Sequence, residues 1–189
     1  MLKQVLSAAA GLIACSQADA ATITFSGLAN GNPAVTSYSE AGFTFTTIAG
    51  TFNGTSGNGA PAPSVFTTNN GIADVTGGSF TFSSFQGGNG SFNNTPTFTV
   101  TGFLAGNQLY TVTYTGGGAG SFPTFTNGNS TVVVDRVRFA VNGTSANLDN
   151  IVVNAVPAVP EPATWFVMLV GFGVTGIAMR RKNTVTRVA

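Results

Sequence analysis

The stretch Tyr110-Thr111-Val112-Thr113-Tyr114 decides the fold, because it alternates large side chains with threonines. Successive side chains of a β-strand point to opposite faces of a sheet, so this alternation predicts a strand with one buried face. Threonine, valine and tyrosine also favour strands. The same pattern recurs along the chain, at Ile23 and Phe25, Phe43 and Phe45, Phe80 and Phe82, Phe98 and Val100, Val133, Val137 and Phe139, and Ile151 and Val153.

Segments rich in glycine and asparagine separate these runs, at residues 53–62, 87–94 and 116–120. Both residue types suit the tight turns between strands. No secure helical period is present in residues 21–156, so about eight to ten antiparallel strands are expected. The sequence predicts an all-β domain, an antiparallel β-sandwich or jelly roll with phenylalanines between its two sheets. A solenoid is the main alternative, although the Gly-Asn-Gly and Phe-Thr-Phe recurrences have no constant spacing.

The composition limits the chemistry of this domain. The chain has no histidine, its single cysteine is Cys15, and charged residues make up 7% of it. Residues 21–156 hold two arginines and four acids, which gives them a formal net charge of −2; the acids are Glu40, Asp74, Asp135 and Asp149. A segment without a basic patch is not expected to bind nucleic acid.

The N-terminus has the features of a signal peptide, predicted over residues 1–20. Lys3 is followed by an apolar stretch and then by Ala18-Asp19-Ala20, which fits the Ala-x-Ala site of signal peptidase. Cleavage after Ala20 would leave a domain of residues 21–156. Alternatively, the residues that end at Cys15 fit a lipobox, in which Cys15 would be lipidated. Both routes export the domain.

The C-terminal segment, residues 157–189, has the features of a membrane anchor. From Ala163 to Met179 the chain is uncharged and mostly apolar. A helix of about 17 residues is about 25 Å long, which just spans a bilayer. Trp165 suits one membrane interface, and the basic cluster that begins with Arg180 and Arg181 suits the cytoplasmic side of the other. A single transmembrane helix over about residues 163–179 is therefore expected, with a basic tail after it.

The order of parts in this tail resembles the PEP-CTERM sorting signal of Gram-negative bacteria. Pro160-Glu161-Pro162 comes first, then Trp165, an apolar helix with glycines, and Arg180-Arg181. The residue after the tryptophan is Phe166, where this variant of the signal usually has alanine. The resemblance implies that exosortase, a membrane-embedded cysteine protease-transpeptidase, cuts near Pro160-Glu161-Pro162. A permanent single-span anchor is the alternative.

A second resemblance concerns the β domain. Residues 22–28, 37–45 and 148–153 look like the corresponding stretches of many uncharacterised PEP-CTERM proteins. Such domains are similar to galactose-binding-like jelly rolls, which is the fold that this resemblance implies.

The composition argues against an enzyme. Without histidine or a mature-domain cysteine, the domain cannot build a Ser-His-Asp triad, a cysteine nucleophile or a histidine-ligated zinc site. A glycosidase needs two facing carboxyl groups. We expect Asp74 to cap the turn after Gly71-Ile72-Ala73, and Asp135 to be a solvated or ion-paired sheet residue. The domain is therefore predicted to be non-catalytic.

Two ligand classes remain for the domain. Calcium, the one cofactor considered, binds carboxylate and amide oxygens, and Glu40, Asp149 and Asn150 could supply them if the first and last strands are neighbours. An ordinary turn at Asp149-Asn150 is the alternative interpretation. Sugars stack on exposed aromatic rings, and the candidates for such stacking are Tyr38, Tyr110 and Tyr114.

The sequence therefore predicts an exported, non-catalytic protein of the cell surface or of the extracellular polysaccharide matrix. Its expected partners are signal peptidase, exosortase, the inner membrane before processing and extracellular polysaccharide. A lectin-like carbohydrate-binding module is the alternative function.

Overall fold

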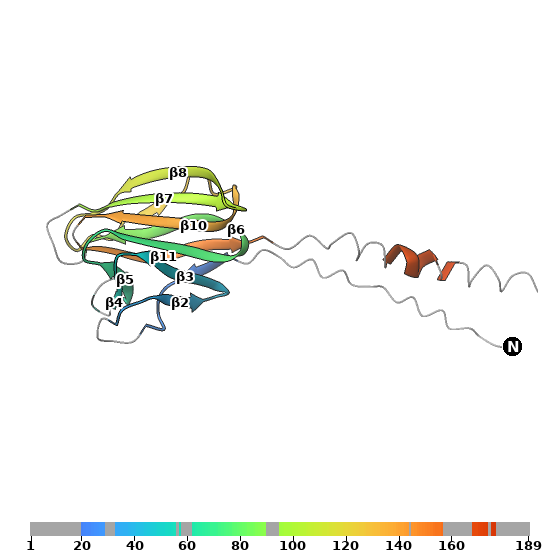
Figure 1. The fold of residues 1–189 in the computed structure, drawn as a ribbon, viewed down its shortest axis with the longest axis horizontal. Helices are drawn as coiled ribbons and strands as arrows, with labels where there is room; N and C mark the ends of the chain where they lie inside the picture. The colour runs from blue at the N-terminus through green and yellow to red at the C-terminus, as the bar shows by residue number, and fades with distance from the viewer. Residues whose placement is uncertain are drawn as a thin grey trace, which may run out of the picture. The chain divides into compact units, whose positions relative to one another are not determined.

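The computed structural model describes residues 20–28, 33–55, 57, 62–89, 95–143, 145–156, 168–173 and 175–176. The chain divides into two units, residues 1–157 and 158–189. The described part of the first unit forms eleven strands, shown in Figure 1: β1 (Ala20–Ile23), β2 (Ser37–Glu40), β3 (Phe43–Ala49), β4 (Phe52–Thr55), β5 (Ser64–Thr67), β6 (Gly71–Gly88), β7 (Thr97–Leu104), β8 (Asn107–Thr115), β9 (Thr124–Thr126), β10 (Val133–Asn142) and β11 (Ala146–Ala155).

Every pairing between these strands is antiparallel. The predicted all-β, antiparallel fold is therefore confirmed. The turn prediction for residues 53–62 was partly wrong, because Phe52–Thr55 is a strand that pairs with β5. The predicted turn at 87–94 begins too early, since β6 continues to Gly88. Residues 116–120 lie outside the named strands, as predicted.

The 18-residue strand β6 belongs to two layers of the fold. Its first half pairs with β3 and β10, and its second half pairs with β11 and β9. The change occurs at a bulge in which β6 has three residues opposite one of β10, between the pairs Thr76–Arg136 and Phe80–Val134. Gly78 in this bulge has φ +78°, a conformation that glycine adopts without strain.

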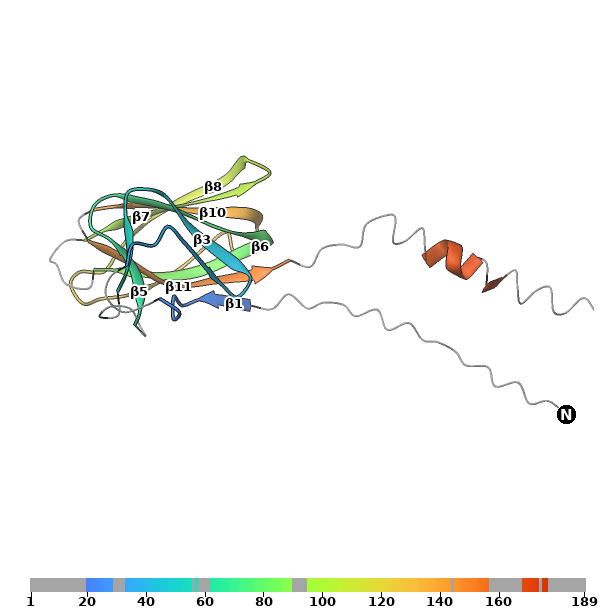
Figure 2. The same ribbon diagram turned by 60° about the horizontal axis from the view of Figure 1, so that its bottom comes forward.

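We name the two layers by their strands. Layer A runs in the order β2-β3-β6-β10-β7-β8, and layer B consists of β9, β6 and β11 with β1, β5 and β4 beyond it. Figure 2 shows them from a second side. Phe85 of layer B lies 5.5 Å from Phe98 and 5.3 Å from Phe139 of layer A, measured between ring centroids. The inward faces of the two layers thus share one aromatic core.

The predictions about the two ends of the chain, the signal peptide and the sorting tail, concern residues most of which the structure does not describe. Of the predicted signal peptide the structure describes Ala20, in β1; Cys15 and Ala18 lie outside. The sorting residues Pro160, Glu161, Pro162, Trp165, Arg180 and Arg181 also lie outside. In the second unit, residues 168–173 and 175–176 are helical. Nowhere in the described ranges is a helix both long and apolar enough to cross a membrane, and the span over 163–179 stays a prediction.

Candidate functional site

The outer face of layer A carries four of the six charged side chains of residues 21–156. We call these residues, together with Phe103, the charged cluster: Asp74, Asp135, Arg136, Arg138 and Phe103. Asp74 comes from β6, Phe103 from β7, and the others from β10. In a domain with so few charges, their gathering on one face is the clearest polar feature of the described surface.

Asp74 is the centre of the cluster and is 5% exposed. Arg138 donates two hydrogen bonds to it, from Nε to Oδ1 at 2.7 Å and from Nη2 to Oδ2 at 2.9 Å. The hydrogen bonds to Asp74 raise the pKa of Arg138 above its ordinary value. Nη1 of Arg136 lies 3.7 Å from Oδ2 of the same carboxylate. One buried acid therefore holds two guanidinium groups in place.

Arg136 is less completely paired than Arg138. Its Cζ lies 4.2 Å from the centroid of the Phe103 ring, within the range of a cation–π contact. Its Nε is buried and has no hydrogen-bond partner among the described residues. The Arg136 side chain as a whole is 31% exposed, so part of it reaches the surface. The guanidinium of Arg136 therefore lies over the Phe103 ring and next to the Asp74 carboxylate.

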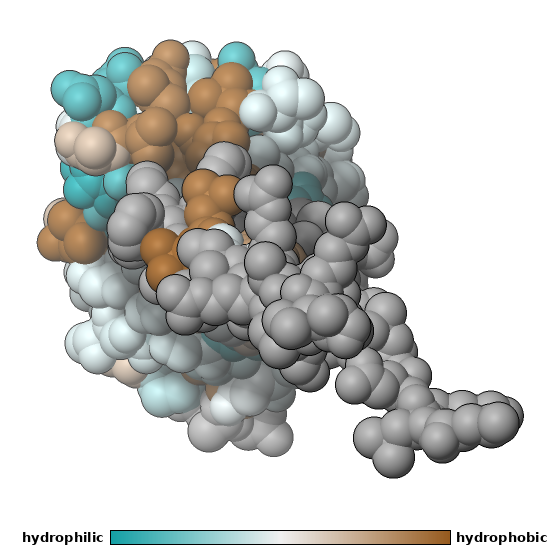
Figure 3. All heavy atoms as spheres, turned by 90° about the vertical axis from the view of Figure 1, so that its right-hand side faces the viewer, coloured by the Kyte–Doolittle hydropathy of each residue, from teal (hydrophilic) through white to brown (hydrophobic). Residues whose placement is uncertain are grey.

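Asp135 completes the cluster at the end of the β7–β8 hairpin. Its Oδ2 accepts a hydrogen bond of 2.7 Å from the backbone N–H of Ala105, which has φ +49° in the hairpin turn. The carboxylate therefore holds the hairpin beside Arg136. Figure 3 looks at this end of the domain and shows hydrophobic and hydrophilic residues next to one another in its upper part.

Rows of hydroxyl groups surround the cluster. The register places Thr46, Asp74, Arg138, Thr101 and Thr111 in one line across five strands. Within this line the hydroxyls of Thr101 and Thr111 lie 3.1 Å apart. Two further pairs lie beside it, Ser39 with Thr44 at 3.0 Å and Thr99 with Thr113 at 3.2 Å. The face thus combines guanidinium donors, carboxylate acceptors and hydroxyls that can do both, which is chemistry that suits a polyhydroxylated ligand.

The prediction that Asp74 caps a turn was wrong. Asp74 lies inside β6, opposite Arg138 of β10 and 64 residues away from it in sequence. The sequence did contain a signal for a charged site, since Arg136 and Arg138 are two residues apart on one strand and therefore share a face. Their common partner could not be read from the sequence, because alternation does not show which strands are neighbours.

The three tyrosines proposed for sugar stacking all pack inward. Tyr110 is 9% exposed, and its hydroxyl accepts a hydrogen bond of 3.4 Å from Nδ2 of Asn127. Burial raises the pKa of Tyr110 to about 12. Tyr114 is half-buried against Phe85 and Phe125, at 5.3 Å in both cases. Tyr110 therefore offers no open ring face, and Tyr114 offers little.

Tyr38 and Glu40 instead stabilise the chain that follows β1. The Glu40 carboxylate accepts hydrogen bonds from the backbone N–H groups of Thr24 and Phe25, at 2.7 and 2.9 Å, and from the side chains of Thr24, Ser26 and Tyr38. Burial raises the pKa of this carboxyl, but the hydrogen bonds outweigh burial and leave the pKa below 4.5. Because Phe25 has φ +56°, this carboxylate supports an unusual backbone conformation.

Replacing Glu40 with glutamine is expected to destabilise the fold by about 1 to 2 kcal/mol near neutral pH. Both carboxylate oxygens of Glu40 accept hydrogen bonds, and a glutamine would place an NH₂ group, itself a donor, opposite some of those donors. Because the folded pKa of Glu40 is lowered, its contribution is complete above about pH 4.5 and is lost as the pH falls through the folded pKa. Urea unfolding of both proteins between neutral and acid pH measures the difference. A Glu40→Gln variant whose deficit is the same at every pH would contradict this account.

Asp149 and Asn150 lie within β11 at a bulge, not in a turn before the last strand. Asp149 is fully buried, and its Oδ1 accepts a hydrogen bond of 2.8 Å from the backbone N–H of Asn150. Nδ2 of Asn150 donates to Oε1 of Gln86 at 2.8 Å. Strands β1 and β11 are neighbours, as the calcium hypothesis required. Within the described ranges, however, no three histidine, cysteine or acidic side chains form a metal-binding group, and calcium stays a prediction.

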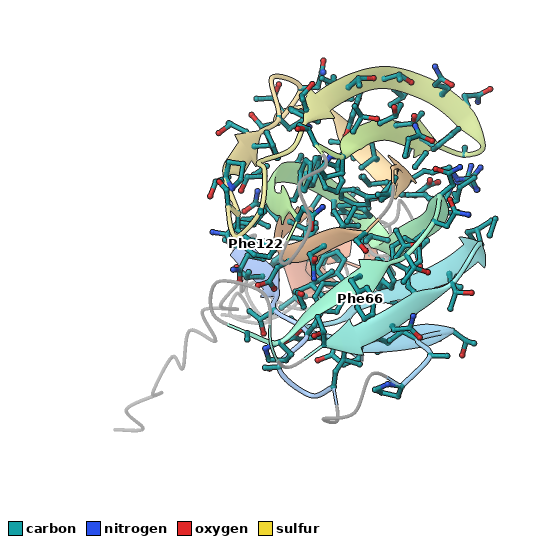
Figure 4. The ribbon with its side chains drawn as sticks, turned by 90° about the vertical axis from the view of Figure 1, so that its left-hand side faces the viewer. Phe66 and Phe122 are labelled. Carbon is teal, nitrogen blue, oxygen red and sulfur yellow. The ribbon has the colours of Figure 1, made fainter. Side chains whose placement is uncertain are left out.

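Two half-buried phenylalanines were missed by the sequence reasoning. Figure 4 labels Phe66, from β5, and Phe122, from the segment between β8 and β9, both at the end of the domain opposite the one in Figure 3. Phe66 lies between Asn53 of β4 and Asn147 of β11 in register. The alternation pattern assigns phenylalanines to the core, so it did not mark these two as partly exposed.

Comparison with known proteins gives distant likenesses for the β domain. No curated protein is similar enough to the chain to count as a relative. A family 29 carbohydrate-binding module from Piromyces equi is 8% identical, with a TM-score of 0.44 over 74% of this chain and 91% of that module. The module TmCBM61, solved in complex with β-1,4-galactotriose, is 12% identical, with a TM-score of 0.37 over 60% of this chain and 88% of that one.

The enzymatically active domain of tailspike protein 4 from bacteriophage CBA120 is 16% identical, with a TM-score of 0.38. The alignment covers 61% of this chain and 20% of that one, so this chain spans about a fifth of the tailspike domain. With TM-scores this low, none of these likenesses bears on the function of the chain.

The tail gives a specific match. Residues 158–182 fit the family described as the PEP-CTERM protein-sorting motif. The match includes Pro160-Glu161-Pro162, Trp165 and Arg180-Arg181, the residues on which the resemblance was based, so that prediction is confirmed. The chain therefore carries a PEP-CTERM sorting signal, which marks it as an exported protein that is held in the membrane until exosortase processes it.

Proposed function

We propose that this protein is a non-catalytic component of the cell surface or of the extracellular polysaccharide matrix, and that the outer face of layer A contacts the polysaccharide. Signal peptidase releases the N-terminus, and exosortase releases the domain from its tail near Pro160-Glu161-Pro162. The β domain is a sandwich of the jelly-roll, galactose-binding-like kind, and its open face is what reaches the matrix.

One observation carries this proposal: the charged cluster lies among rows of hydroxyls on one face of an exported domain. Sugar hydroxyls both donate and accept hydrogen bonds, and this face offers both functions. The exposed part of Arg136 supplies donors, and its guanidinium lies over the Phe103 ring. The threonine rows on either side extend the polar surface along a chain-like ligand.

A lectin-like module with a single defined site is the second candidate. The contacts of Arg136 and Arg138 with the Asp74 carboxylate favour this candidate. Guanidinium groups that are held in place before binding select one ligand geometry more strictly than scattered hydroxyls do. The two candidates share the same surface, and saturable binding at low polysaccharide concentration would separate them.

The test is to fractionate cultures of the producing bacterium that express the full-length chain. We expect the wild-type protein in the extracellular polysaccharide fraction, with an intact mass that ends near residues 160–162. A variant that carries Arg136→Gln and Phe103→Ala should keep the same processed mass and bind isolated polysaccharide about tenfold more weakly.

The matched control is Phe66→Ala, which removes a half-buried phenylalanine from β5, a strand of layer B that carries no residue of the charged cluster. This variant should bind as the wild type does. Equal binding by all three proteins, or the absence of wild-type protein from the polysaccharide fraction, would overturn the proposed function.

A further inference from the structure

Strand β8 is the end strand of layer A. It pairs with β7, and within the described ranges no strand pairs with its other edge. Figures 1 and 2 both show β8 beyond β7 at the margin of the layer. From Leu109 to Thr115 its residues alternate between exposed outward positions and less exposed inward ones, and Asn107 and Gln108 before them are also exposed. Such an edge presents backbone N–H and C=O groups that a further strand can use.

The bulge in β8 lies at Leu109, near the start of the strand, and from Tyr110 to Thr115 the strand has none of the features that protect edge strands. Residues 107–115 contain no charge, no proline and no glycine. Natural edge strands are usually protected by lysines, prolines, bulges or short length. The other end strand of layer A, β2, has four residues and ends at Glu40. The long, uncharged edge of β8 is therefore the one suited to pairing with another chain.

The middle of β8 is a palindrome. Tyr110-Thr111-Val112-Thr113-Tyr114 reads the same in both directions. In an antiparallel pair of identical strands centred on Val112, Tyr110 of one copy faces Tyr114 of the other, and Thr111 faces Thr113. Aromatic pairs and threonine pairs are both favourable across antiparallel strands. The same pairing is symmetric about a two-fold axis, as in most homodimers.

We propose that β8 pairs with β8 of a second copy of this chain, antiparallel and centred on Val112, so that layer A continues from one copy into the next. The outward threonines then form an unbroken polar row across both copies. The inward Tyr110, Val112 and Tyr114 extend the aromatic core to the junction. Leu109, which is 45% exposed, lies at the bulge beside this pairing.

A second copy fits this edge better than other occupants do. The edge has no charged side chain with which to bind a charged peptide. A second copy of β8 supplies a strand whose tyrosines and threonines match those of the first, because residues 110–114 read the same in both directions. The domain has a formal net charge of only −2, so two copies repel each other weakly. The inference is independent of polysaccharide binding, because it concerns the edge of the layer and not its outer face.

The experiment changes the charge on two outward positions of β8. In a Thr111→Lys/Thr113→Lys variant, the proposed pairing places two lysines opposite two lysines. In a Thr111→Lys/Thr113→Glu variant, it places each lysine opposite a glutamate. Sedimentation velocity of the full-length chain in mild detergent measures the dimer affinity of each. We expect the first variant to dimerise about tenfold more weakly than wild type, and the second to recover.

The matched control is Thr99→Lys/Thr101→Lys on β7. It adds the same charges to the same face and removes the same two threonine pairs, but it lies on an interior strand. Its dimer affinity should equal that of the wild type, and circular dichroism checks that each variant is folded. A monomeric wild-type protein, or equal affinity in all four proteins, would overturn the proposal.

Discussion

Replacing Phe85 with alanine is expected to lower the free energy of unfolding by about 4 to 5 kcal/mol. Phe85 is fully buried and packs against five other aromatic rings. The centroid distances are 5.1 Å to Phe125, 5.3 Å to Tyr114 and Phe139, 5.5 Å to Phe98, and 6.3 Å to Phe82. These rings come from both layers, from β7, β8 and β10 of layer A and from β6 and β9 of layer B, so one residue joins the two layers.

The expected effect is at the upper end for this kind of substitution because the site cannot collapse. The strands that carry the neighbouring rings are held by their own ladders, so the cavity stays open and the lost contacts are not replaced. Urea unfolding of the full-length chain in mild detergent, followed by the β-sheet circular dichroism signal, measures the change. Phe66→Ala is the control, since it makes the same chemical change at a half-buried site and should cost less than half as much.

Replacing Asp74 with alanine should cost about 3 kcal/mol. The substitution removes the acceptor of both Arg138 hydrogen bonds and leaves two guanidinium groups near each other without a counter-charge. The two arginines are about one-third exposed, so water relieves part of this cost, and the expected value lies at the lower end for a buried ion pair.

The control for Asp74 is Asp135→Ala on the same face. Asp135 accepts one backbone hydrogen bond from Ala105, so its loss should cost about 1 kcal/mol. The same urea measurement applies to both variants. Equal losses for Asp74→Ala and Asp135→Ala would show that Asp74 is not the centre of the cluster.

Much of the fold follows from local pattern. Alternation at Phe43 and Phe45 or at Phe98 and Val100 identified strands, and these side chains are buried as a period of two requires. The sorting signal was also local, because the matched motif lies within the short segment of residues 158–182. The inward packing of the candidate tyrosines, in contrast, did not follow from local pattern. Alternation shows that Tyr110 and Tyr114 share a face, but not that this face points into the core.

The sequence by itself determined that the domain is all-β, that it is exported and that its tail carries a sorting signal, since each depends on neighbouring residues in the chain. The tertiary structure decided the rest. It pairs Asp74 with Arg138, which is 64 residues away in sequence, and it places the Glu40 carboxylate against the backbone that follows β1. It also places β8 at the edge of its layer. The physical reason is that strand order sets which side chains meet, and strand order results from packing of the whole domain.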